Sequence, residues 1–212
     1  MIILVIAFIL LLWIVIGNLR QRRGNYFDLY FGVPGSGKTT FAAYLAKKYL
    51  KNKRRVLSNV SIKGCYELNR EDIGHYEIID CLMLYDEAGI DYNNRNFKEK
   101  DKKMSKEEIY FYKYHRHYNV DIAIFSQSHD DSDVTLRRLA TRYYLVTKSI
   151  FPGFVRRKLI TKKIGIDKNT HQIIDEYRFA FFGVKYIYCP KLWKMFNSYS
   201  YKELPKKEFA KY

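Results

Sequence analysis

Residues 28–40 read DLYFGVPGSGKTT, and they give the clearest indication of how the chain folds. Between Gly32 and Thr39 the sequence matches the phosphate-binding pattern G-x-x-x-x-G-K-[ST] at every fixed position. Glycines in this pattern let the backbone turn tightly, so that successive N–H groups point inward at a polyphosphate. The pattern predicts that the chain binds a nucleoside triphosphate.

The flanking sequence supports this interpretation, because a phosphate loop must leave a strand and open a helix. A short apolar run at 29–31 precedes the loop, and apolar residues recur at helical spacing from Phe41 to Tyr49. The N-terminus of such a helix is itself an anion site. We therefore predict an α/β fold of the P-loop NTPase class with a mostly parallel sheet.

Each loop residue has an expected role toward ATP and Mg²⁺. Lys38 would reach the β- and γ-phosphates, and the Thr39 hydroxyl would ligate Mg²⁺. The residues expected to contact the nucleotide are Gly32, Val33, Pro34, Gly35, Ser36, Gly37, Lys38, Thr39 and Thr40.

A second signature follows at residues 81–87, CLMLYDE, where an apolar strand delivers two acids to its C-terminal end. Asp86 is expected to hold Mg²⁺ through water, and Glu87 to polarise the water that attacks the γ-phosphate. A strand that ends in two acids is common by itself. The phosphate loop some fifty residues earlier makes the catalytic interpretation the favoured one.

The rest of the predicted core supplies further candidates. Ser105 and Glu108 form a capping box at a helix start, and residues 120–125 read as a buried strand. Gln127, just after that strand, could sense the γ-phosphate. Arg116, Arg138 and Arg137, the last in a short predicted helix at 134–139, are candidates for an arginine finger. Ordinary surface arginine is the default interpretation, and Arg137 is the favoured candidate. For His115 and His117 we expect packing and capping rather than metal binding.

Composition narrows the partners and the compartment. The 212 residues hold 38 Lys+Arg against 22 Asp+Glu, a formal charge of +16, which favours nucleic acid or the inner face of a membrane. Cys65, Cys81 and Cys189 form no C-x-x-C pair, which argues for reduced thiols and against a disulfide framework or zinc site.

Residues 1–19 are predicted to be a single-pass transmembrane anchor. The run from Ile2 to Gly17 holds no charge, and as a helix it would span about 24 Å. Arg20, Arg22 and Arg23 follow it, so the positive-inside tendency places the N-terminus outside and the ATPase domain in the cytoplasm. A buried core helix is the alternative.

The remaining chain is expected to divide at residue 150. Residues 24–150 would form the ATPase core and 151–212 a basic, β-rich extension with a hairpin over 155–166 and 172–182. The extension holds 14 Lys+Arg and 5 Asp+Glu, or +9 of the total. One face of the hairpin is expected to be basic, formed by Arg156, Arg157, Lys158, Lys162 and Lys163. This face would contact nucleic acid or simply be solvated, and the sequence does not decide between the two.

The order of these motifs resembles the zonular occludens toxin (Zot) family, the assembly ATPases of filamentous phages. The resemblance covers residues 27 to 200. It rests on the loop at 32–40, LYDEA at 84–88, HRH at 115–117, DI at 121–122, SQ at 126–127, RRL at 137–139 and FNSYS at 196–200. One departure is the anchor, which precedes the ATPase segment here and follows it in typical members.

The resemblance implies a membrane ATPase that drives filamentous phage assembly and extrusion, or DNA export, from the host inner (cytoplasmic) membrane. A homo-oligomer is expected, with single-stranded DNA or a phage coat or DNA-binding protein as partner. Two alternatives stay open. One is a DNA-translocating transfer or segregation ATPase, and the other is a nucleotide-gated membrane scaffold that hydrolyses little.

Overall fold

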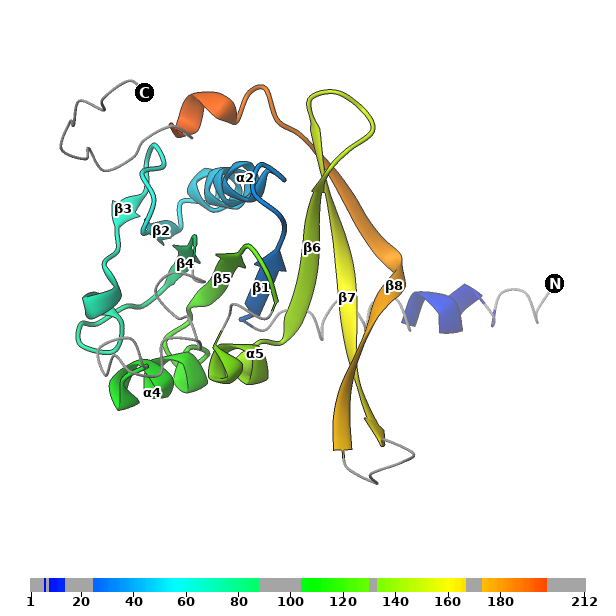
Figure 1. The fold of residues 1–212 in the computed structure, drawn as a ribbon, viewed down its shortest axis with the longest axis horizontal. Coiled ribbons are helices and arrows are strands. Elements are labelled where there is room, and N and C mark those ends of the chain that lie inside the picture. Colours follow the sequence, from blue (N-terminus) through cyan, green and yellow to red (C-terminus); the bar gives the residue numbers. More distant parts are fainter. Residues whose placement is uncertain are drawn as a thin grey trace, which may run out of the picture.

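The computed structural model describes residues 6, 8–13, 25–87, 104–129, 133–166 and 173–197. Within these residues one sheet of eight strands runs through the molecule in the order β3-β2-β4-β5-β1-β6-β7-β8 (Figure 1). The strands are β1 Phe27–Phe31, β2 Arg55–Ser58, β3 Tyr66–Glu67, β4 Cys81–Tyr85, β5 Asp121–Ser126, β6 Arg142–Lys148, β7 Phe154–Ile166 and β8 Ile173–Tyr188.

Helices cover both faces of the sheet. Helix α2 (Lys38–Lys51) packs on one face through residues such as Phe41 and Ala42, against alternate side chains of the central strands. Helices α4 (Lys106–Tyr114) and α5 (Val134–Leu139) pack on the other face through Phe111 and Leu136. The central strands are buried on both faces, as in other mostly parallel sheets. The predicted α/β class is confirmed.

Strand β1, which leads into the phosphate loop, lies inside the parallel part of the sheet between β5 and β6. It pairs in parallel with β5 on one side and β6 on the other, and β4 lies beyond β5. The carboxyl ends of β1, β4 and β5 therefore meet at one edge, which is where open α/β sheets bind ligands. The phosphate loop leaves β1 at this edge.

Strands β7 and β8 extend the same sheet past residue 150. Strand β7 pairs antiparallel with β6, and β8 pairs antiparallel with β7. The ribbon projects from the helix-covered part of the molecule (Figure 1). The domain boundary at 150 stays a prediction, while the sheet itself is continuous across that position.

The expected basic face does not form on one side of this ribbon. Arg157 lies over the Tyr144 ring, with the guanidinium carbon 4.1 Å from the ring centroid, on the side covered by α2. Arg156 and Lys158 flank it in the strand and so point to the opposite face. Expecting neighbouring residues to share a face was wrong, because side chains alternate along a strand.

Two other predicted elements compare closely with the structure. The capping box of Ser105 and Glu108 is confirmed at the start of α4. Residues 55–62, RVLSNVSI, read as one strand in the sequence, but β2 ends at Ser58, because the Ser58 hydroxyl accepts from the Val60 N–H and donates to the Val60 carbonyl and so turns the chain.

The predicted anchor lies mostly outside the described residues. Residues 6 and 8–13 are helical, and their apolar side chains are exposed. Among the residues that the structure describes, no helix is both long and apolar enough to cross a bilayer. The predicted hairpin turn at 167–170 also lies outside them.

Candidate nucleotide-binding site

The phosphate loop needs glycine at two positions because other atoms approach its backbone closely. A Cβ on Gly32 would lie 2.5 Å from both the Ser36 hydroxyl and the Val146 carbonyl oxygen. A Cβ on Gly37 would lie 2.4 Å from a Val155 methyl carbon, and Gly37 has a φ of +97°. Both glycines are therefore required by the packing of the loop against β6 and β7.

Lys38 lies across the loop rather than out in solvent. Its ammonium donates to the carbonyl oxygen of Gly32 at 2.7 Å and of Val33 at 3.3 Å. Burial lowers the pKa of Lys38, and the carboxylates of Asp86 and Glu87 partly offset that effect. The ammonium group of Lys38 is thus held beside the first two residues of the loop.

The two predicted metal ligands are in contact. The Thr39 hydroxyl donates to Asp86 Oδ2 at 2.8 Å, and Asp86 is almost fully buried. A hydroxyl and one carboxylate suit Mg²⁺, which takes oxygen ligands and usually keeps several waters. No group of three or more His, Cys, Asp and Glu suited to a metal occurs in the described part of the chain. The residues present fit a magnesium ion shared with phosphates rather than an all-protein metal site.

Asn59 is a site residue that the sequence did not indicate. Its side chain accepts from the Asp86 N–H at 2.7 Å and donates to the Asp86 carbonyl at 2.9 Å. This clamp joins the end of β2 to the end of β4 and fixes the backbone that carries Asp86. In the sequence Asn59 falls inside the run 55–62 that reads as a strand, so no local pattern marks it as a site residue.

Glu87 and Gln127 follow β4 and β5, two neighbouring strands on the same side of β1. Glu87 is exposed, has a left-handed φ of 57°, and donates its N–H to Asp86 Oδ1 at 2.9 Å. Gln127 is exposed directly after Ser126, whose carbonyl accepts from Gly32 N–H at 3.2 Å. Both side chains are at the edge where the loop begins, and their catalytic roles stay predictions.

Arg137 is placed on α5, on the face of the sheet opposite α2. Its Nη1 lies 3.1 Å from Nδ1 of His129. The His129 ring meets the Phe31 ring edge-on, with centroids 5.3 Å apart, and Phe31 immediately precedes the loop. The structure therefore brings Arg137 near the strand that carries the loop, and its role as an arginine finger stays a prediction.

His115 has the structural role expected for it. It is buried, Nδ1 lies 2.8 Å from the Tyr112 carbonyl oxygen, and its ring meets Phe27 edge-on. Burial is the main cause that lowers the pKa of His115. The packing prediction for His115 is confirmed.

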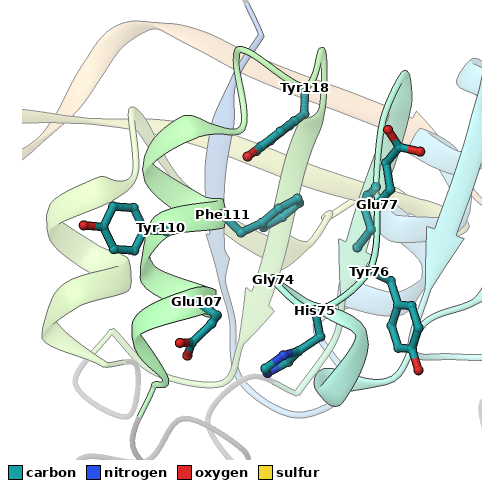
Figure 2. Close-up of a pocket in the computed structure, with 9 residues that line it drawn as sticks. Gly74, His75, Tyr76, Glu77, Glu107, Tyr110, Phe111 and Tyr118 are labelled. Carbon is teal, nitrogen blue, oxygen red and sulfur yellow. The ribbon is translucent and has the colours of Figure 1, made fainter.

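A cavity of about 420 Å³ lies elsewhere, between α4 and the segment at 74–78 (Figure 2). Figure 2 shows Glu107, Tyr110 and Phe111 on α4 on one side of it and His75 on the other. None of its lining residues belongs to the phosphate loop. This cavity is therefore separate from the candidate nucleotide-binding site.

Comparison with known proteins places these features in context. The family model described as zonular occludens toxin (Zot) matches residues 67–202. The N-terminal domain of zonular occludens toxin from Neisseria meningitidis is 19% identical and aligns over 82% of this chain and 100% of its own, with a TM-score of 0.49.

Two other solved structures are similar at lower identity. The genome packaging NTPase of Sulfolobus turreted icosahedral virus 2, in complex with ATP-gammaS, is 11% identical over 71% of this chain and 96% of its own, with a TM-score of 0.45. The flagellar accessory protein FlaH from Methanocaldococcus jannaschii is 12% identical over 64% and 77%, with a TM-score of 0.42. No curated protein matches the chain.

Proposed function

The chain belongs to the zonular occludens toxin (Zot) family, and we propose that it is a Mg²⁺-dependent ATPase that drives filamentous phage assembly and extrusion at the host cytoplasmic membrane. One observation carries the enzymatic part of this proposal. The Thr39 hydroxyl and the buried Asp86 carboxylate, 47 residues apart in sequence, are hydrogen-bonded beside the phosphate loop.

The geometry supports phosphoryl chemistry at this edge of the sheet. Lys38 exchanges its contacts with the loop carbonyls for the β- and γ-phosphate oxygens, whose negative charge pairs with the buried ammonium. Thr39 and, through water, Asp86 would hold Mg²⁺, which neutralises charge on the phosphates when bound. The N–H groups of the loop and of the first turn of α2 point at the same anion.

Glu87 is the residue proposed to orient the attacking water. It follows Asp86 directly, and the hydrogen bond from its own N–H to Asp86 Oδ1 ties its backbone to the metal ligand. A carboxylate in this position can accept a proton from the water that attacks the γ-phosphorus while ADP departs as the leaving group. Gln127, at the end of the neighbouring strand, is proposed to contact the γ-phosphate.

Membrane location and partners form the second part of the proposal. Family membership supports phage assembly, and the uncharged segment 2–17 followed by three arginines supports a single-pass anchor with the ATPase domain in the cytoplasm. The charge of +16 supports an anionic partner, for which single-stranded DNA or a phage DNA-binding or coat protein is proposed. A homo-oligomer would bring a neighbour's arginine to each active site.

The direct experiment measures phosphate release by the full chain in mild detergent, with and without Mg²⁺ and single-stranded DNA, together with particle mass. We expect Mg²⁺-dependent release that DNA stimulates and that Lys38→Ala abolishes. A chain that binds Mg-ATP as a monomer and shows no turnover with or without DNA contradicts the proposal.

A further inference from the structure

A second cavity adjoins the phosphate loop on the side away from Asp86. Its volume is about 290 Å³. One wall is the loop and the start of α2, and the other is the connection from β6 to β7 together with Trp193. The lining includes Gly35, Gly37, Thr40, Phe151, Pro152 and Trp193.

The order of the strands gives the phosphate loop a different neighbour on each side. Asp86 follows β4, which lies beyond β5 on one side of β1, and it is hydrogen-bonded to Thr39. A magnesium ion held by these two residues, and the γ-phosphate beside it, would lie on that side. Strands β6 and β7 lie on the other side of β1. A nucleotide with its γ-phosphate at the Asp86 end therefore extends its α-phosphate and nucleoside toward β6 and β7, where this cavity lies.

The wall formed by the β6–β7 connection is held in place against the loop. Ser149 N–H donates to the Phe154 carbonyl at 3.1 Å, and Cys189 N–H donates to the Gly153 carbonyl at 2.8 Å. Val155, the second residue of β7, is in contact with the position of Gly37, where a Cβ would overlap it. Figure 1 shows this connection extending past the carboxyl end of β6, beside the start of α2. Hydrogen bonds and packing therefore fix the wall of the cavity beside the phosphate loop.

Two aromatic side chains in the wall are left largely exposed. Phe151 is 64% exposed and Trp193 is 54% exposed, although each contributes to the cavity. The edge of the Tyr186 ring supports Phe151, with centroids 6.5 Å apart. Lys148 and Ser149 add polar groups at the same wall. Flat aromatic surface with a few polar groups is the chemistry that binds a nucleobase and its ribose.

We propose that this cavity is the nucleoside half of the ATP site, with Phe151 and Trp193 as the surfaces on which the base stacks. The inference rests on the proposed nucleotide binding and adds a site for the base, which the loop pattern does not specify. Stacking of a base on an aromatic ring contributes strongly to the affinity for a nucleotide. Removing one such ring should therefore weaken ATP binding about 5- to 100-fold.

The test compares two ligands that share the phosphates and differ in the nucleoside. Binding of Mg-ATP and of inorganic triphosphate with Mg²⁺ is measured by calorimetry on the full chain in detergent, for the unaltered protein, Phe151→Ala and Trp193→Ala. Both variants should bind ATP about 5- to 100-fold more weakly and inorganic triphosphate unchanged. Phe151→Tyr keeps the ring and should restore ATP binding.

A matched control and a spectroscopic readout sharpen the result. Phe181 is 92% exposed on β8 and does not line the cavity, so Phe181→Ala should leave both affinities unchanged. Trp13 and Trp193 are the only tryptophans, so in a Trp13→Phe chain the fluorescence should report on the cavity alone. ATP should change this fluorescence and inorganic triphosphate should not.

The outcomes separate this inference from the proposed function. If Phe151→Ala and Trp193→Ala bind ATP as tightly as the unaltered chain while Lys38→Ala does not, the base binds elsewhere and the proposed function stands. If the unaltered chain binds neither ATP nor inorganic triphosphate, both proposals are wrong.

Discussion

Asn59 provides a sharp test of how the site is assembled, because its role follows from the structure alone. Replacing it by alanine removes two hydrogen bonds to the Asp86 backbone, at 2.7 and 2.9 Å. Each such bond contributes about 0.5–1.5 kcal/mol net, so Asn59→Ala should lower the free energy of unfolding by about 1–3 kcal/mol. The backbone that carries Asp86 should also lose its fixed position.

The functional consequence should appear in the metal dependence. Losing a hydrogen bond that holds a metal-ligating residue in place typically lowers metal affinity or activity about 10- to 100-fold. Asn59 holds the backbone of Asp86 rather than its carboxylate, so we expect an effect at the lower end of this range. We therefore expect the Mg²⁺ concentration for half-maximal phosphate release to rise about 10-fold. Urea unfolding measures the stability change, and Mg²⁺ titration of phosphate release measures the second effect.

Asn119 offers a matched control at the opposite edge of the sheet. Its side chain also makes two hydrogen bonds, to Asp80 at 2.6 Å and from Asn25 at 3.1 Å, and its φ of 53° adds a backbone cost to any alanine substitution. Asn119→Ala should lower stability and leave the Mg²⁺ dependence unchanged. An Asn59→Ala chain with unaltered Mg²⁺ dependence would refute the proposed coupling between the β2 end and Asp86.

Three further predictions concern the membrane, the ribbon and the neighbouring subunit. An engineered C-terminal cysteine should stay unlabelled by an impermeant reagent in intact cells, and labelling would exclude the proposed topology. Changing both Arg156 and Lys158 to Gln should make the slope of log affinity against log salt concentration for single-stranded DNA shallower by about 0.7 for each phosphate that is no longer neutralised. Arg157→Gln, which changes a side chain packed on Tyr144, should leave that slope unchanged. Equal slopes for all variants and the unaltered chain would leave the ribbon as a solvated face. Mixing Arg137→Ala with Glu87→Gln chains should restore some ATP hydrolysis if the finger acts between subunits, and mixed assemblies that stay inactive would count against it.

Local sequence patterns predicted which residues gather at the phosphate loop, and the structure brings several of them together. The phosphate loop needs its glycines, Lys38 and Thr39 within a few consecutive residues, and the strand that ends in Asp86 carries its own signal. The hydrogen bond between Thr39 and Asp86 then follows from the general rule that parallel strands meet at their carboxyl ends. The loop residues could be predicted from their own segment, and Asp86 from its strand taken together with the loop.

What escaped prediction depends on which strands are neighbours. Asn59 reaches Asp86 only because β2 pairs with β4, and no pattern in either segment states that pairing. Likewise, β7 joins the sheet through β6, which the β-rich composition of the extension did not show. The opposite directions of Arg156 and Arg157 were, by contrast, available from the two-residue period of a strand.

Glu87→Gln tests the proposal that this site hydrolyses ATP to do work. The change keeps the size of the side chain and removes the carboxylate that orients water, while Lys38, Thr39 and Asp86 remain to bind Mg-ATP. Loss of general-base assistance typically lowers the rate about 10²- to 10⁴-fold.

The measurement pairs ATP binding and hydrolysis with release of phage particles from cells that carry each variant. We expect Glu87→Gln to bind ATP normally, hydrolyse it poorly and block release, and Lys38→Ala to be defective in binding as well. If Glu87→Gln cells release particles normally while Lys38→Ala cells do not, ATP binding alone is sufficient, and the chain is a nucleotide-gated scaffold rather than a motor.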